Sequence, residues 1–164
     1  MLNRTRMKGF TLFELLVTIA VAAVIVSFGV PGFTSFIQNS RAVTHTNELV
    51  TALNLARSEA SRRGAPVEVC RSTNGAACQD GDDWTAGWAV VAGGEVLRAW
   101  PRRSGGDNLV TAPDNGRIRF GARGSLASAA VTLEVRLPDC TGNQRRDVSD
   151  NAAGRIEVTR EACQ

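Results

Sequence analysis

Hydrophobic side chains fill the first part of the chain almost without interruption. Residues 10–30 hold one charged side chain, Glu14, and the rest of the run is mostly apolar. A helix of this length spans roughly 31 Å at about 1.5 Å per residue, which matches the hydrocarbon core of a bilayer. The run is longer than the core of a cleaved secretory signal and continues without a small-x-small cleavage site. We therefore expect residues 10–30 to form a retained transmembrane helix.

The pattern turns amphipathic after residue 38. Small and apolar residues recur there at three- and four-residue steps, on one face of a helix: Thr46, Leu49, Val50, Leu53, Ala56 and Ala60. Gly64 suits a left-handed helix cap, and Pro66 cannot continue a helix. We expect the helix to continue from the membrane segment over residues 31–64, and to loosen near residues 29–32, which include a proline and two glycines.

Beyond the proline the pattern alternates with period two, which is typical of strands. Gly93-Gly94 separates two such segments and favours a hairpin. The expected strands are Val67–Arg71, Trp88–Val91, Glu95–Trp100, Leu109–Ala112, Arg117–Phe120, Val131–Leu137 and Arg155–Thr159. A long helix followed by antiparallel strands predicts an α+β fold, with a β-rich domain over residues 65–164.

Charge sets the expected orientation but says little about partners. The net charge is +3, and Arg4, Arg6 and Lys8 precede the apolar run. These basic residues keep the amino terminus in the cytoplasm and place the polar domain outside. Residues 10–164 carry 16 basic and 16 acidic side chains. The overall charge therefore gives no argument for nucleic acid, and any such argument depends on local clusters of arginine.

The carboxylate of Glu14 needs an explanation, because an acidic side chain in hydrocarbon costs about 2.5–3.5 kcal/mol on insertion scales. One interpretation places it at the helix start, where the helix dipole favours negative charge. The other gives it a partner amine. Cleavage between Gly9 and Phe10 would create an α-amino group four residues away in the same chain, or beside Glu14 of a neighbouring subunit.

Four cysteines allow three disulfide pairings. Sequence order favours Cys70–Cys78 and Cys140–Cys163, and an exported domain enters an oxidising compartment that suits disulfides. Free structural thiols are the alternative. A zinc site is disfavoured, because the cysteines lack the short spacings and histidine partners of such sites.

Residue types that carry catalysis are scarce. The chain has one histidine, His45, and it lacks tyrosine, a G-x-S-x-G motif, a P-loop and dinucleotide-binding glycines. No cysteine lies near His45, so we expect this side chain on the surface. Asp80-Gly81-Asp82-Asp83 lacks the spacing of a calcium loop, which predicts a solvated turn. We expect no enzymatic activity, no cofactor and no metal.

Arginine side chains cluster between residues 98 and 123. This segment holds six arginines against two aspartates, a local charge of +4, and arginine forks suit phosphate oxygens. The other interpretation is the solvated face of a strand, since Arg117 and Arg119 alternate around Ile118. The residues alone leave both interpretations open.

The segment from Lys8 to Leu16, KGFTLFELL, resembles the class III signal of type IV pilins and type II secretion pseudopilins. One position holds Phe where Ile or Val is more usual. The resemblance implies a leader over residues 1–9, which a prepilin peptidase removes after Gly9 before it methylates Phe10. It also implies that Glu14 guides assembly into a filament.

A second resemblance covers nearly the whole chain. Residues 47–60 with Arg63-Gly64, the first cysteine strand, the tryptophan-rich hairpin and Gly154-Arg155 resemble the FimT/GspH family of pilin-like proteins. This family implies a pilin-like fold, with one long helix packed on antiparallel β-sheets. It also implies an inner-membrane protein whose periplasmic domain joins other pilins and minor pilins, at low copy number near a filament tip. The helix sequence favours a FimT-type minor pilin of a type IV pilus. The alternatives are a GspH-like secretion pseudopilin and a purely structural priming subunit.

FimT-type proteins are implicated in DNA uptake during natural transformation, and a carboxyl-terminal Gly-Arg-x-Arg motif is associated with DNA contact. Gly154 and Arg155 match this motif, but Glu157 replaces the second arginine and shares the strand face of Arg155. We therefore expect weak, non-specific binding of double-stranded DNA, or a site moved to other arginines. The candidates are Arg160 on the other strand face, Arg145 and Arg146 in the preceding loop, and the patch of Arg102, Arg103 and Arg117.

Overall fold

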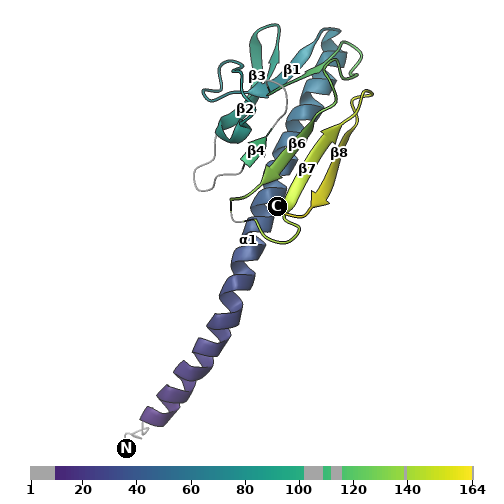
Figure 1. The fold of residues 1–164 in the computed structure, drawn as a ribbon. Coiled ribbons are helices and arrows are strands. Elements are labelled where there is room, and N and C mark those ends of the chain that lie inside the picture. Colours follow the sequence, from purple (N-terminus) through teal and green to yellow (C-terminus); the bar gives the residue numbers. More distant parts are fainter. Residues whose placement is uncertain (1–9, 102–108, 112–115, 139, 164) are drawn as a thin grey trace, which may run out of the picture. The chain divides into compact units, whose positions relative to one another are not determined.

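The computed structural model of the chain describes residues 10–101, 109–111, 116–138 and 140–163, with the backbone alone at 28–31 and 109–111. Within this part, one long helix, α1 (Leu12–Arg63), precedes eight strands and a short 3-10 helix (Figure 1). The chain divides into two compact units, Met1–Ile37 and Gln38–Gln164.

The first unit consists, where it is described, of the amino-terminal part of α1. Thr11 precedes the helix, and its Oγ1 accepts a hydrogen bond from the Glu14 amide at 3.2 Å. A threonine followed three residues later by a glutamate is the signature of a helix capping box. The apolar side chains here are exposed, and with a mean hydropathy of 2.4 in one window α1 is long and apolar enough to cross a membrane. The helix continues through residues 29–32, so the proline and glycines there do not end it, and the expected loosening stays a prediction.

The second unit contains two four-stranded antiparallel sheets in its described part. The first sheet has the order β3-β2-β1-β5 and comprises β1 (Val67–Arg71), β2 (Gly87–Ala92), β3 (Glu95–Pro101) and β5 (Arg117–Phe120). The second has the order β4-β6-β7-β8 and comprises β4 (Leu109–Thr111), β6 (Thr132–Arg136), β7 (Arg145–Asp150) and β8 (Ile156–Glu161). The short helix η1 (Trp84–Ala86) leads into β2. The β2–β3 pairing confirms the hairpin predicted around Gly93-Gly94.

One hydrophobic core joins both sheets to the second half of α1 (Figure 1). Leu49, Leu53 and Ala56 are each 1% exposed or less and form the helix side of this core. Phe120 of the first sheet and Leu133 of the second are equally buried. The apolar face predicted from the three- and four-residue steps is therefore confirmed, as is the α+β architecture.

The expected surface position of His45 is wrong. This residue is only 8% exposed, and its Nδ1 lies 3.8 Å from Oε2 of Glu48. The reason is its place in the helix, four residues before Leu49, on the face that the sheets cover. A single polar residue on a buried helix face is not distinguishable from a surface residue by its neighbours in sequence.

Strand β7 was not predicted, and the expected loop around Arg145 and Arg146 is therefore wrong. Its sequence, RRDVSD, has Val148 as its single apolar residue. The structure nevertheless gives it the alternation of a strand, with Arg146, Val148 and Asp150 buried between partly exposed neighbours. It pairs with β6 on one side and β8 on the other. Backbone pairing on both sides, rather than apolar side chains, makes this segment a strand.

Both disulfides have the pairing that sequence order favours. Cys70 in β1 is bonded to Cys78 in the following loop, with their Cα atoms 5.5 Å apart. Cys140 before β7 is bonded to Cys163 after β8, with a Cα separation of 5.7 Å. The Cys163 amide also donates to the carbonyl of Gly142 at 2.8 Å. The end of the edge strand β8 is thus fixed to the loop that precedes β7.

Candidate functional site

The candidate processing and assembly residues lie at the start of α1. Gly9 lies outside the described residues. The Phe10 side chain is 72% exposed. Glu14 occupies the first turn of α1, where its negative charge is favourable beside the positive end of the helix dipole. This agrees with the interpretation of Glu14 as a helix-start acid, while its role toward an α-amino group stays a prediction.

Arg145 is one of the candidate DNA-binding residues, and the structure surrounds it with carboxylates. Its guanidinium donates two hydrogen bonds to Asp147, at 2.8 and 2.7 Å, and lies 3.5 Å from Oε1 of Glu134. The hydrogen bonds that Arg145 donates to Asp147 raise the pKa of Arg145, an effect that the Coulomb attraction of the nearby acids reinforces. A guanidinium held in this way has few donors left for a phosphate.

Arg146 faces the interior of the second unit. It is 5% exposed, and its guanidinium donates to Oδ1 of Asn39 in α1 at 2.7 Å and to the carbonyl oxygen of Asn143 at 3.0 Å. Burial, and then the neighbouring charge of Arg160, lower the pKa of Arg146. Arg160 lies directly opposite on β8 and is exposed. Of these two candidates, only Arg160 can reach a ligand without rearrangement.

The candidate Arg117 belongs to a charge network on the first sheet. Its guanidinium lies 2.9 Å from Oδ1 of Asp80 and 3.4 Å from Oε2 of Glu68, and the hydrogen bond that it donates to Asp80 raises the pKa of Arg117. Arg119 donates to the other oxygen of Glu68 at 2.6 Å. Two arginines and two carboxylates leave this network neutral. The candidates Arg102 and Arg103 lie outside the described residues.

Arg155 stands apart from these paired arginines. It precedes β8, in a turn held by hydrogen bonds from its amide to Oδ1 of Asn151 and from the Asn151 amide to its carbonyl. The side chain is exposed, and among the described residues its guanidinium has no hydrogen-bond or ion-pair partner. Glu157 lies two residues further, on the face of β8 opposite Arg160. The opposite faces expected for Glu157 and Arg160 are therefore confirmed. Arg155 precedes β8, so the face that it shares with Glu157 stays a prediction.

Two further arginines lie near Arg155. The sequence does not single out Arg57 as a candidate, and it places Arg123 only in the arginine cluster of residues 98–123. Arg57 of α1 donates from Nη2 to the carbonyl of Ala153 at 3.2 Å, in the same turn. Arg123 is exposed and lies beside Gly124, whose carbonyl oxygen touches Gly154. These contacts join segments far apart in the chain, so no local motif could have indicated them.

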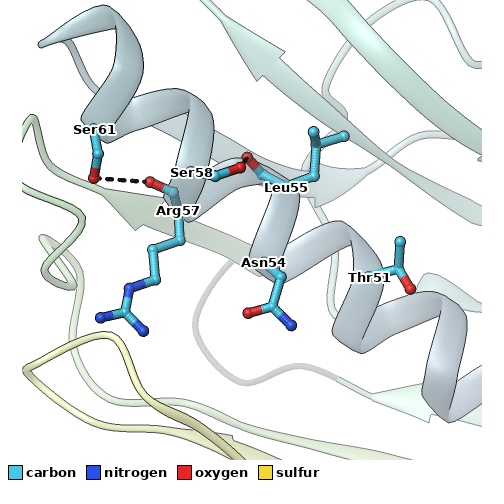
Figure 2. Close-up of a pocket in the computed structure, with 6 residues that line it drawn as sticks. All are labelled: Thr51, Asn54, Leu55, Arg57, Ser58 and Ser61. Atoms are coloured by element: carbon cyan, nitrogen blue, oxygen red, sulfur yellow. Dashed lines mark hydrogen bonds between the residues drawn. The ribbon is translucent and has the colours of Figure 1, made fainter.

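A shallow groove runs along α1 beside Arg57 (Figure 2). Its described lining is polar except for one leucine, and contains no carboxylate: Thr51, Asn54, Leu55, Arg57, Ser58 and Ser61. The Ser58 and Ser61 hydroxyls donate to the carbonyls of Leu55 and Arg57, at 2.9 and 3.2 Å. The guanidinium of Arg57 is the only charged group that lines this groove in the part of the chain described.

Comparison with known proteins agrees with this architecture. A family model described as type II transport protein GspH matches residues 45–154, and one for the prokaryotic N-terminal methylation motif matches residues 4–30. No curated protein matches the sequence.

Two crystal structures of the type IV minor pilin FimU from Pseudomonas aeruginosa PAO1 have a similar fold. The form in space group P21 gives a TM-score of 0.61 at 21% identity, over 79% of this chain and 97% of FimU. The form in P65 gives 0.55 at 23% identity, over 72% and 94%. One long helix packed on two antiparallel sheets is thus a pilin fold. With the family match over two thirds of its length, the chain belongs to the GspH/FimT family of type IV pilin-like proteins.

Proposed function

We propose that the chain is a minor pilin of a type IV pilus. In this proposal residues 1–9 are a leader that a prepilin peptidase removes after Gly9. Residues 10–30 anchor the subunit in the inner membrane, with the amino terminus in the cytoplasm and the second unit in the periplasm. The match to the N-terminal methylation motif over residues 4–30, which includes the start of an exposed apolar helix, carries this proposal.

The mature amino terminus tests the processing step. We expect mass spectrometry of the membrane-extracted protein to find a chain that begins at Phe10 and carries one additional methyl group. Glu14→Gln should be processed in the same way, yet fail to enter filaments, because the proposed partner of its carboxylate is an α-amino group in the assembly. An intact leader, or normal assembly of Glu14→Gln, would contradict the proposed roles.

A type II secretion pseudopilin is the second candidate, because the matching family model carries the description of a type II transport protein. The pilus is favoured by the helix sequence over residues 47–60, which resembles FimT-type minor pilins. Deletion of the gene in its own bacterium separates the two. Loss of pili with normal secretion supports the pilus, and loss of secretion with normal pili supports the secretion system.

We also propose that the second unit binds double-stranded DNA without sequence preference, through Arg155. The supporting observation is that this guanidinium is exposed and unpaired within the described structure, whereas Arg145, Arg146 and Arg117 are held by other protein groups. Contacts limited to phosphates do not read the sequence and weaken steeply with salt.

Titration of the full-length protein in detergent against short duplex DNA tests this role. We expect binding at about 50 mM salt that weakens at about 200 mM, and a weaker complex for Arg155→Gln. Arg98→Gln is the matched control, because it removes one charge from β3, where Arg98 stacks 4.7 Å from the centroid of Trp100. If no salt-sensitive binding is found, the proposed DNA binding is contradicted, and the purely structural pilin remains as the function.

A further inference from the structure

Three segments of the second unit meet beside Arg155. The turn that ends at Gly124 follows β5, the turn from Asn151 to Gly154 joins β7 to β8, and both lie against α1. The Leu126 amide donates to the carbonyl of Ala152 at 3.2 Å, which ties one turn to the other. The hydrogen bond from Arg57 to Ala153 ties the second turn to the helix.

Glycine makes this approach possible. Gly124 and Gly154 have φ angles of +73° and +74°, in the left-handed region that glycine adopts without strain. A Cβ atom on Gly154 would overlap the carbonyl oxygen of Gly124, and one on Gly124 would lie 2.6 Å from Oγ of Ser61. Arg123 and Arg155 each stand one residue from this contact, and consecutive Cα atoms are about 3.8 Å apart. The fold thus brings the backbone positions of both arginines close together.

The charge at this place is positive. Arg57, Arg123 and Arg155 contribute three guanidinium groups, and the groove along α1 adds no described carboxylate. Glu59, the nearest acid along the helix, accepts hydrogen bonds from Arg62 and Arg63 instead. Two acids lie close to Arg155 in the chain: Glu157, and the buried Asp150, which accepts a hydrogen bond from the Val131 amide. Three arginines outnumber these two acids, so the balance stays positive.

Arg160 is not part of this group. It lies five residue steps along the chain from Arg155, about 17 Å at about 3.3 Å per residue of strand. It also lies on the face of β8 opposite Glu157. A second positive charge next to Arg155 therefore comes from the turn that contains Arg123, and not from Arg160 in β8.

We propose that Arg123 is a phosphate-binding residue, and that it forms with Arg155 and Arg57 a composite site for the DNA backbone. In this site Arg123 supplies the second arginine, which the tail lacks because residue 157 is a glutamate. Arg57 holds the Asn151–Gly154 turn through Ala153 and adds its positive charge. This inference rests on the proposed DNA binding and names the partners of Arg155 in it.

The test compares single and double variants of the full-length protein in detergent, with short duplex DNA at about 50 and about 200 mM salt. Each lost phosphate contact reduces the salt slope by about 0.9, which makes the ratio of the two affinities about 3.5-fold smaller. We expect this reduction for Arg123→Gln and for Arg155→Gln, and a reduction of about 12-fold for the double variant. Arg98→Gln should bind like the unaltered chain. Equal unfolding midpoints identify variants that keep the fold.

A rescue variant adds a measurement that a merely structural role of Arg123 would not affect. Adding Glu157→Arg to Arg123→Gln should restore the affinity, because it returns a second arginine to the site. If Arg123→Gln binds like Arg98→Gln while Arg155→Gln is weakened, the composite site is overturned and the proposed DNA binding stands. If the unaltered chain does not bind, or Arg155→Gln has no effect, the proposed DNA binding fails and the composite site fails with it.

Discussion

Gly154 packs against the carbonyl oxygen of Gly124, so closely that a Cβ atom at residue 154 would overlap this oxygen. Its φ angle of +74° adds strain for any other residue. Gly154→Ala should therefore lower the free energy of unfolding by about 3 kcal/mol, the sum of a steric overlap and a strained backbone. Denaturant unfolding of the full-length protein in detergent measures this loss.

Gly142 offers a matched control for this substitution. Its φ angle is +59°, and a Cβ atom there would meet no atom within 4 Å. Gly142→Ala therefore incurs the backbone strain alone, about 1 kcal/mol. Equal losses for the two variants would mean that the contact with Gly124 contributes nothing, and that close packing does not require glycine at residue 154.

Arg145→Gln should separate stability from DNA affinity. The substitution removes two short hydrogen bonds to Asp147 and the approach to Glu134, in a pair whose side chains are only 19% and 16% exposed. We expect a loss of about 1 kcal/mol in the free energy of unfolding and no change in DNA affinity. Denaturant unfolding and the DNA titration check the two outcomes. A weaker DNA complex with unchanged stability would contradict this prediction and show that Arg145 contributes to DNA binding.

Periodicity predicted much of the fold, because the amphipathic half of α1 and strands such as β1, β5 and β6 bury alternating or regularly spaced apolar residues. The strand Val67–Arg71 coincides with β1, and Arg117–Phe120 with β5. Strand β7 escaped prediction because its buried positions include Arg146 and Asp150, which a binary pattern scores as exposed. Hydrogen bonds across the fold, such as that from Arg146 to Asn39, make their burial possible.

The candidate site was less predictable than the fold. The tail arginine was found through a motif of adjacent residues. The residues around it are brought together by contacts among Arg57, Gly124 and the turn at Gly154. These residues are far apart in the chain, so no local sequence pattern predicts the contacts. The local charge of residues 98–123 favours a binding patch around Arg117 instead of the tail. In the structure, however, Asp80 and Glu68 neutralise Arg117 and Arg119.

The two disulfides should stabilise the second unit unequally. A cross-link removes more entropy from the unfolded chain when it closes a longer loop. Sequence separations of 8 and 23 residues correspond to about 2.5 and about 3.4 kcal/mol in the loop-entropy model. Replacing Cys140 and Cys163 by serine should therefore cost about 1 kcal/mol more than the same change at Cys70 and Cys78. The reverse order in denaturant unfolding would show that local packing of the first disulfide outweighs loop entropy.

Glu59 gives the stability of the second unit a dependence on acid pH. Its carboxylate accepts hydrogen bonds from Arg62 at 2.6 Å and Arg63 at 2.8 Å. The hydrogen bond from Arg62, then that from Arg63, lowers the pKa of Glu59 from 4.5 to about 2. A carboxyl whose pKa is lower in the folded state stabilises it above the unfolded-state pKa, and this contribution is lost as the pH falls through the folded-state pKa.

Glu59→Gln should therefore be less stable than the unaltered chain at neutral pH, and the difference should shrink between pH 4.5 and about pH 2. Denaturant unfolding at a series of pH values measures it. Glu95→Gln is the control, because Glu95 is 73% exposed and its ion pair with Arg63 is long, with an N–O distance of 4.0 Å. That variant should follow the unaltered chain at every pH. A Glu59→Gln difference that stays constant down to pH 2 would mean that the carboxylate is not held by the two arginines in solution, since only an ionised Glu59 can be stabilised by them.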